Sequence, residues 1–230
     1  MNASSAVRST VARTEPVRQR RKQARPGELI AAALELFVQR GFAATRLDDV
    51  AKRAGVSKGT LYLYFDSKEA LFKAAIAEGL IPVLDDIDRM LETFTGGTSE
   101  LMEALLLHWW RNVGATPLGG IPKLLISEAR NFPDIAEYYH QVVVQRGHHL
   151  IRRALERGLR EKEFRAVDID ATIEILFAPL LMLVVWQHSF GACDAVTDHP
   201  FRAPEKFLRT HIDLVMHGLR RAQNQRIEPT

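Results

Sequence analysis

The stretch that most constrains this chain is residues 46–68, RLDDVAKRAGVSKGTLYLYFDSK. Apolar residues recur at helical spacing over 47–54, so a short helix there can bury one narrow face. Gly55 follows at a place where a residue without Cβ can turn left-handed at little cost. Ser57 suits the N-cap of a second helix over 58–65. Two helices this short are not stable alone, so the rest of the chain must hold them in place.

The second short helix places Leu61 and Phe65 on one side, where they can pack against the scaffold. Polar and aromatic side chains occupy its other sides: Lys58, Thr60, Tyr62 and Tyr64. A helix that is held by a scaffold and presents such groups outward is suited to contact a partner. The arrangement predicts a helix-turn-helix whose second helix enters the major groove of DNA.

Two neighbouring runs carry a more specific resemblance. AAALELFVQRGFAAT occupies 31–45, and DDVAKRAGVSKGTLYLYFDSKEALF occupies 48–72, where LYLYF and the SKEAL that follows are the most distinctive. The segment 29–71 resembles the DNA-binding domain of the TetR family of bacterial transcriptional regulators. The resemblance implies a dimer with a helix-turn-helix head and a helical body that holds a small effector.

The resemblance also implies which residues contact DNA, through bases or through phosphates. Lys68, in the first turn of the next helix, is expected to contact a phosphate. Thr45 is expected to cap the first short helix and to contact a phosphate through its hydroxyl. The expected contacts are Thr45, Arg46, Ser57, Lys58, Gly59, Thr60, Tyr62, Tyr64 and Lys68.

Two residues depart from the family pattern. Arg46 stands where a small hydroxyl residue is common, and it can add a phosphate or base contact. Leu63 stands where a polar residue is usual. A leucine can meet a thymine methyl group but cannot read a donor or an acceptor, so the bases that this helix discriminates are left open.

The chain divides into four expected segments: a disordered basic arm (1–25), a DNA-binding domain (26–72, motif about 47–66), a ligand-binding and dimerisation domain (73–222) and a tail (223–230). Pro26 suits a first helical position, and Asp66 with Glu69 forms a capping box that opens a fourth helix. The arm is too poor in aliphatic residues to offset its ordering entropy. It either follows DNA phosphates or only solubilises the chain.

The body shows helical periodicity and no strand alternation, so we expect an all-α protein with a three-helix head and a body of about six helices. The expected body helices span about 67–93, 99–113, 121–131, 132–160, 168–189 and 203–222. The helix 169–188 is apolar nearly all round and must be covered on more than one side. The resemblance implies that the last two helices form a homodimer interface; the alternative is a fully buried central helix.

Charge is divided unevenly along the chain. The net charge is only +3, but residues 1–75 carry fourteen Lys and Arg against seven Asp and Glu. A basic front end favours a polyanionic partner there. The apolar run 173–186 is interrupted by Glu174 and Pro179 and looks too short to cross a membrane. Without a secretory signal, and with Cys193 as the single cysteine, the chain is expected in the cytoplasm.

Signs of catalysis are weak. Residues 55–59 satisfy G-x-S-x-G, which would make Ser57 a hydrolase nucleophile, but that motif needs a strand before it, and here the preceding residues read as helix. The eight histidines show no metal-binding spacing. We therefore expect no enzyme, no metal and no cofactor, with the hydrolase kept as a remote alternative.

Aromatic and polar residues of the body are candidates to line an effector cavity. An apolar lining with few polar groups suits a small hydrophobic or amphipathic molecule. The candidates are Trp109, Trp110, Glu128, Phe132, Phe177, Met182 and Trp186, with Arg130, Tyr138 and His188 as further members.

Together these features predict a sequence-specific dimeric repressor that such a ligand releases from a near-palindromic operator. The alternative is an activator or architectural protein that binds DNA without a ligand.

Overall fold

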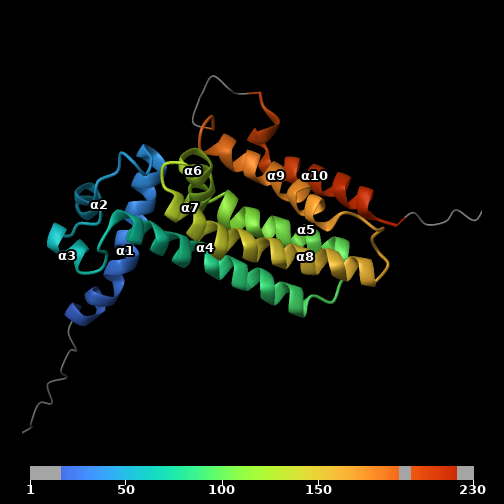
Figure 1. The fold of residues 1–230 in the computed structure, drawn as a ribbon, viewed down its shortest axis with the longest axis horizontal. Helices are drawn as coiled ribbons and strands as arrows, with labels where there is room; N and C mark the ends of the chain where they lie inside the picture. The colour runs from blue at the N-terminus through green and yellow to red at the C-terminus, as the bar shows by residue number, and fades with distance from the viewer. Residues whose placement is uncertain (1–16, 192–197, 222–230) are drawn as a thin grey trace, which may run out of the picture.

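The computed structural model describes residues 17–191 and 198–221, and over these ranges the protein is all-α, which confirms the predicted fold class. Figure 1 shows a small head on one side, made of α1, α2 and α3, and a larger body formed by the remaining helices. The head helices are α1 (Val17–Arg40), α2 (Leu47–Arg53) and α3 (Lys58–Tyr62).

The body begins with α4, which starts beside the head and runs into the body, while α6 and α7 lie between the head and the remaining helices (Figure 1). The body helices are α4 (Lys68–Thr93), α5 (Thr98–Trp109), α6 (Gly120–Glu128), α7 (Pro133–Tyr139), α8 (Gln145–Arg160), α9 (Ile169–Gln187) and α10 (Pro204–Leu219).

The first helix begins earlier than predicted. The basic arm 1–25 was expected to be disordered, yet α1 starts at Val17 and Pro26 lies inside it. Gln, Arg, Lys and Ala dominate 17–25 and are good helix formers, which outweighs the one backbone hydrogen bond that a proline removes. The rest of the arm (1–16) and the tail (223–230) lie outside the described residues.

Two glycines make the turns of the head. Gly41 (φ 85°) follows the end of α1, and Gly55 (φ 67°) follows α2, as predicted for Gly55. After α2, the N–H of Val56 donates to the carbonyl of Ala51 at 2.9 Å, and the N–H of Gly55 donates to Lys52 at 3.1 Å. This pair of bonds is a Schellman motif, which needs a left-handed residue at the position that Gly55 occupies.

The fourth helix is capped by a different residue from the one predicted. Ser67, not Asp66, is the N-cap of α4, and its Oγ accepts the N–H of Ala70 at 3.0 Å. Ser and Asp cap equally well, so the residue that takes the role is decided by where the chain enters the helix.

Two predicted helices are interrupted by π-helical turns. The helix expected over 99–113 becomes α5 followed by η1 (Trp110–Gly114), and the one over 132–160 becomes α7, η3 (His140–Val144) and α8. A Cβ on Gly114 would collide with the indole of Trp110, so the glycine makes room for that ring. Such turns inside α-helices are frequent at functional sites.

Helix α9 is one continuous helix, close to the 168–189 predicted. It runs through Pro179 and, by length and composition, is the one helix of the described residues that could cross a membrane. The judgement that no segment was long enough was therefore wrong. The core helix of a soluble protein passes the same test, and α9 packs against α6, α8 and α10.

Candidate nucleic-acid interface and effector cavity

The second helix of the motif is short and fixed at its N-terminus. Ser57 is its N-cap: Oγ accepts the N–H of Thr60 at 3.1 Å and lies 2.8 Å from Oγ1 of the same residue. Leu61 is fully buried and anchors α3 to the head, whereas Leu63 is 81% exposed. Because Ser57 follows α2 and not a strand, the context of a hydrolase nucleophile is missing.

A lysine on the outer face of α3 is paired within the protein. Lys58 Nζ lies 2.9 Å from Asp48 Oδ1 of α2 and 5.9 Å from the ring centroid of Tyr62. The hydrogen bond from Lys58 lowers the pKa of Asp48, and the same bond raises the pKa of Lys58. Both side chains are exposed, so a phosphate that approaches Lys58 competes with the Asp48 carboxylate for it.

Thr45 does not have the role predicted for it. Its side chain is 2% exposed, and Oγ1 lies 2.8 Å from the Gly41 carbonyl and 3.2 Å from that of Leu36. The N-cap of α2 is Arg46, whose side chain makes no capping bond. The Thr45 hydroxyl therefore faces carbonyls near the end of α1 and in the turn that follows it, instead of facing a phosphate.

Lys68 is also engaged within the protein. Its Nζ donates to the carbonyls of Phe42 at 2.7 Å and Ala43 at 3.1 Å, and it lies 4.5 Å from the Phe42 ring centroid. These carbonyls stabilise a cation that the N-terminus of α4 disfavours. Of the other expected DNA contacts, Arg46, Gly59 and Tyr62 are exposed, while Thr60 and Tyr64 are half-buried.

The body touches the head at the residue that follows Gly41. Glu128, the last residue of α6, accepts the N–H of Phe42 through Oε1 at 3.2 Å. The Phe132 ring meets the Phe42 ring edge-on at 4.6 Å between centroids. Both were predicted to line an effector cavity; instead they form the contact between head and body. Phe42 is fully buried, so the backbone groups beside it need partners within the protein.

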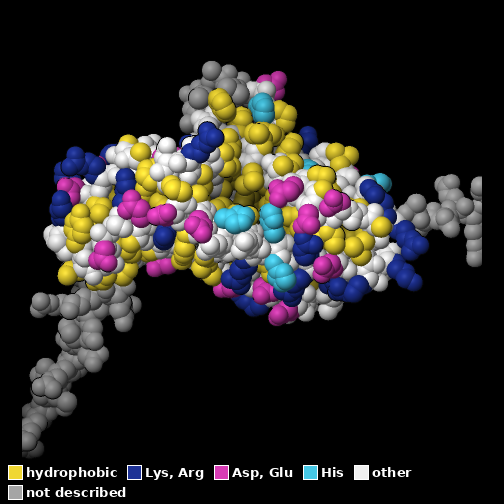
Figure 2. Space-filling model, viewed as in Figure 1, with side chains coloured by type: hydrophobic (Ala, Val, Ile, Leu, Met, Phe, Trp, Pro, Cys, Tyr) yellow, Lys and Arg dark blue, Asp and Glu magenta, His cyan; other side chains and the backbone are white. Residues whose placement is uncertain are grey.

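A cavity of about 450 Å³ that opens to the surface lies in the body, lined by residues from α4, α5, α6, α7, η3, α8 and α9. On the face shown in Figure 2, hydrophobic side chains line a hollow near the middle, and His side chains lie at its edge. One π-helical turn is at this cavity, because His140 and Val143 of η3 line it, whereas η1 begins directly after the lining residue Trp109 and contributes none of its own residues. The volume is within the range of small-molecule sites.

Two of the seven predicted ligand residues, Trp109 and Phe177, line this cavity, with their rings edge-on at 6.2 Å. Of the other predicted residues, Trp110 is buried beside Gly114, and Met182 is 54% exposed on α9. Trp186 stacks on His199 with centroids 5.3 Å apart.

The further candidates also lie away from the cavity. The Tyr138 ring carries Lys73 Nζ at 5.3 Å from its centroid, His188 lines a separate hollow against α1, and Arg130 is exposed at the end of α6. Helical spacing alone does not show which side of a helix faces a cavity and which side faces the packed core.

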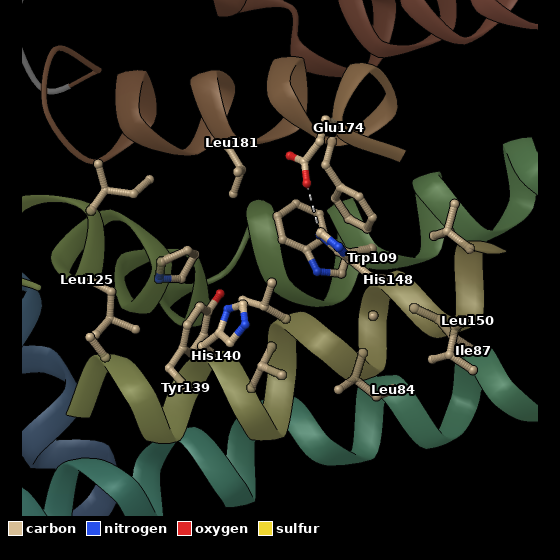
Figure 3. A pocket seen from close by; sticks show the side chains of 18 of the residues that line it. Leu84, Ile87, Trp109, Leu125, Tyr139, His140, His148, Leu150, Glu174 and Leu181 are labelled. Atoms are coloured by element: carbon tan, nitrogen blue, oxygen red, sulfur yellow. Dashed lines mark ion pairs between the residues drawn. The ribbon is translucent and has the colours of Figure 1, made fainter. Parts of the chain in front are cut away.

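The polar residues of the cavity were missed by the sequence analysis. They are Tyr139, His140, His148 and Glu174. Glu174 Oε1 lies 3.5 Å from His148 Nε2, above the Trp109 indole (Figure 3). Burial raises the pKa of Tyr139. The sequence signal that could have pointed to Glu174 is an acidic residue within the apolar run of α9. No group of His, Cys, Asp and Glu among the described residues could hold a metal ion.

Comparison with protein families gives two matches, one over the head and one over most of the body. Residues 29–75 match the family described as "Bacterial regulatory proteins, tetR family", and residues 94–199 match "Tetracyclin repressor-like, C-terminal domain". The first covers the helix-turn-helix and the second covers most of the walls of the cavity.

Individual relatives agree. The chain is 30% identical over 169 residues to the uncharacterised HTH-type transcriptional regulator YfiR of Bacillus subtilis, covering 70% of this chain and 78% of YfiR. It is 38% identical over 81 residues to the HTH-type transcriptional activator FasR of Mycolicibacterium smegmatis, covering 35% and 37% of the two chains. The structure of Bacillus subtilis FadR in complex with stearoyl-CoA is similar in fold, with a TM-score of 0.68 at 18% identity, over 84% of this chain and 98% of FadR.

Proposed function

This chain belongs to the TetR family of DNA-binding transcriptional regulators, and from that premise we propose that it is a dimeric repressor released from its operator by a small ligand. The ligand is hydrophobic or amphipathic and occupies the cavity that Trp109 and Phe177 line. The observation that carries this proposal is that α6 both lines the cavity and ends on the head.

The cavity and the head share two helices. On α6, Leu125 and Ile126 line the cavity, and Glu128 accepts the N–H of Phe42. On α4, Leu84 lines the cavity, and Lys68 donates to the carbonyl of the same Phe42. A ligand that moves either helix therefore acts on the turn between α1 and α2. It releases DNA if it binds better to the conformation that DNA disfavours.

On the DNA side, we place Lys58, Thr60 and Tyr62 in or at the major groove, with Gly59 permitting close approach. Phosphate contacts are assigned to Arg46, Ser57, Tyr64 and Lys68. Base-edge contacts give specificity, whereas phosphate contacts position the protein. Lys58 exchanges Asp48 for DNA when it binds, so part of its attraction to phosphate is offset by the loss of that ion pair.

We place the homodimer interface on α9 and α10. Large apolar side chains are exposed on both helices, at Ile175 (56%) and Met182 (54%) on α9 and Leu214 (67%) on α10. Their burial against a second copy removes apolar surface from water. Two symmetric heads then require an operator whose half-sites form a near-palindrome. The site of action of such a dimer is the cytoplasm.

The test is selection of binding sites for the full-length protein from random DNA, followed by fluorescence anisotropy with the selected duplex. We expect a near-palindrome bound about a thousandfold more tightly than random DNA, within the range for specific regulators. Equal and steeply salt-dependent binding to all sequences would contradict a sequence-specific regulator, because that behaviour comes from phosphate contacts alone.

An activator is the second candidate, because the FasR relative is named as one. A reporter gene placed downstream of the selected site separates the two. Repression predicts higher expression in cells that lack the protein, and activation predicts lower expression.

A further inference from the structure

We propose that the cavity selects a hydrophobic cation, such as a long-chain amine or quaternary ammonium compound, over a fatty acid or an acyl-CoA. Glu174 at its rim is the selecting group. This inference rests on the proposed ligand-released function and adds the charge of the ligand to it.

The first argument is the charge of the walls. Among the described residues that line the cavity, Glu174 is the one carboxylate and there is no Lys or Arg. Carboxylates and phosphates are recognised in proteins chiefly by the guanidinium of Arg and the ammonium of Lys. An anionic headgroup in this cavity would lack such a partner and would face Glu174.

The second argument is that nearby cations are already engaged. On α8, Arg146 is paired with Asp85 of α4 at 2.5 Å, and Arg152 is paired with Asp170 of α9. Neither arginine is among the residues that line the cavity. To bind an anionic ligand, one of these arginines would have to leave an existing ion pair and turn inward.

The third argument is the aromatic surroundings of Glu174. Figure 3 shows its carboxylate directed from α9 toward His148, with the Trp109 indole close by. The Phe177 ring lies edge-on to Trp109 at 6.2 Å and stacks with His148 at 6.3 Å. Aromatic faces attract ammonium groups, and indole does so best. A ligand cation at this position would meet a carboxylate and an aromatic wall together.

The remainder of the cavity suits an alkyl chain. Most of its walls away from Glu174 are aliphatic, with Leu84 and Ile87 on α4, Leu125 on α6 and Leu150 on α8, while Tyr139 and His140 are the polar residues there (Figure 3). Each methylene group that enters the cavity is removed from water and adds to binding, so the alkyl chain provides affinity and the headgroup provides selection.

The experiment is isothermal titration calorimetry of the full-length protein with probes that share one chain length: decyltrimethylammonium, 1-decanol, decanoate and decanoyl-CoA, all below micelle-forming concentrations. We expect the cation to bind about tenfold more tightly than decanoate, with decanol between them. The Glu174 side chain is 69% exposed and its charge is screened by water, so Glu174→Gln should weaken the cation about threefold and leave decanol unchanged. Asp170→Asn is the matched control for the cation, because it removes a carboxylate one turn earlier on α9, outside the cavity, and should leave the affinities for the cation and for decanol unchanged.

Binding at the cavity is checked with Gly147→Leu, which adds a side chain to the lining where a Cβ meets no atom closer than 4.0 Å. Tighter binding of decanoate or decanoyl-CoA than of decanol, or a cation preference that survives Glu174→Gln, would overturn the charge selection. Equal binding of all probes that Gly147→Leu abolishes would overturn it too, but would leave the hydrophobic-ligand proposal standing. If no probe binds, or Gly147→Leu has no effect, both proposals fail.

Discussion

The head and the body differ in how tightly their side chains are packed. The head is closed: Phe37, Phe42 and Phe72 are fully buried and meet one another with ring centroids 5.1 to 5.4 Å apart. The body is hollow and keeps a cavity of about 450 Å³ within its helices. This cavity opens to the surface and is lined mostly by apolar side chains, as small-molecule sites commonly are.

The difference separates what each region contributes. A closely packed head holds α3 in one geometry, which the recognition of base edges requires. A hollow body leaves room for an occupant whose presence changes the positions of α4 and α6. The two regions meet at Phe42, whose N–H is held by Glu128 and whose carbonyl is held by Lys68. Four predictions test this contrast, in order of decreasing effect.

Removing bulk from the head should be severe. Phe42→Ala takes away a ring that contacts Phe37, Phe72 and Phe132. We expect a loss of about 3–5 kcal/mol of unfolding free energy, as for buried phenylalanines generally, measured by urea denaturation. Binding to the selected DNA should be lost as well. Loss of less than about 1 kcal/mol would mean that the head is not closely packed.

The acid that caps the body helix α5 should show a pH dependence. Glu163 accepts the N–H groups of Thr98 at 2.6 Å and Ser99 at 2.9 Å. Burial works to raise its pKa, but the hydrogen bond from the Ser99 hydroxyl, together with these backbone bonds, outweighs burial and lowers the pKa. The stabilisation is therefore present above the unfolded pKa and is lost as pH falls through the folded pKa. We expect Glu163→Gln to cost about 1 kcal/mol at pH 7.

The measurement is the free energy of unfolding of wild type and Glu163→Gln across pH. The difference in unfolding free energy between the two proteins should shrink below about pH 4, near the pKa of an unperturbed glutamate. A gap that grows on acidification would reverse the sign and contradict the assignment.

Adding bulk to the cavity should be harmless to the fold. Gly147 lies in α8, where replacing glycine by a better helix former contributes about 0.5–1 kcal/mol. Gly147→Leu should therefore unfold at the same or a slightly higher denaturant concentration, while it removes the response of DNA binding to ligand. Gly158→Leu is the contrasting variant, because a Cβ there collides with Phe164 and should destabilise the body. Equal destabilisation by both would mean that the cavity collapses.

The smallest effect is expected on the DNA face. Asp48→Asn frees Lys58 from its ion pair. Binding to random DNA should strengthen a few-fold at low salt, and the slope of log affinity against log salt should steepen by about one. Asp49→Asn, whose partner is Arg40 of α1 at 3.4 Å, is the control. A change in the preferred sequence with no change in slope would place Lys58 on a base instead of a phosphate.

The head could be predicted closely from sequence because its signals are local. The left-handed Gly41 and Gly55, the cap at Ser57 and the buried Leu61 all follow from residues within one or two turns. The bonds of Thr45 and Lys68 could not be predicted, because their partners are backbone carbonyls of other segments. Both side chains look available to DNA in the sequence and are engaged in the fold.

The cavity was less predictable for the same reason. The periodicity of α5 and α9 marks Trp109 and Phe177 as inward, but it marks Trp110 in the same way. The π-helical turns η1 and η3 shift the register of the residues that follow, and no local pattern announces them. Glu128 lies at the end of α6, and its role depends on a turn 86 residues away. Tertiary arrangement, not local propensity, decides these positions.

The most direct test of the account is the coupling between ligand and DNA measured in both directions. Binding of the selected duplex is titrated with and without saturating decyltrimethylammonium, and ligand binding with and without duplex, for wild type, Glu128→Ala and Glu128→Gln. Linkage requires the two factors to be equal. The account predicts about a tenfold factor in wild type, almost none in Glu128→Ala, and partial recovery in Glu128→Gln, which keeps an acceptor for the Phe42 N–H. An undiminished factor in Glu128→Ala would show that the contact between α6 and the head does not carry the signal.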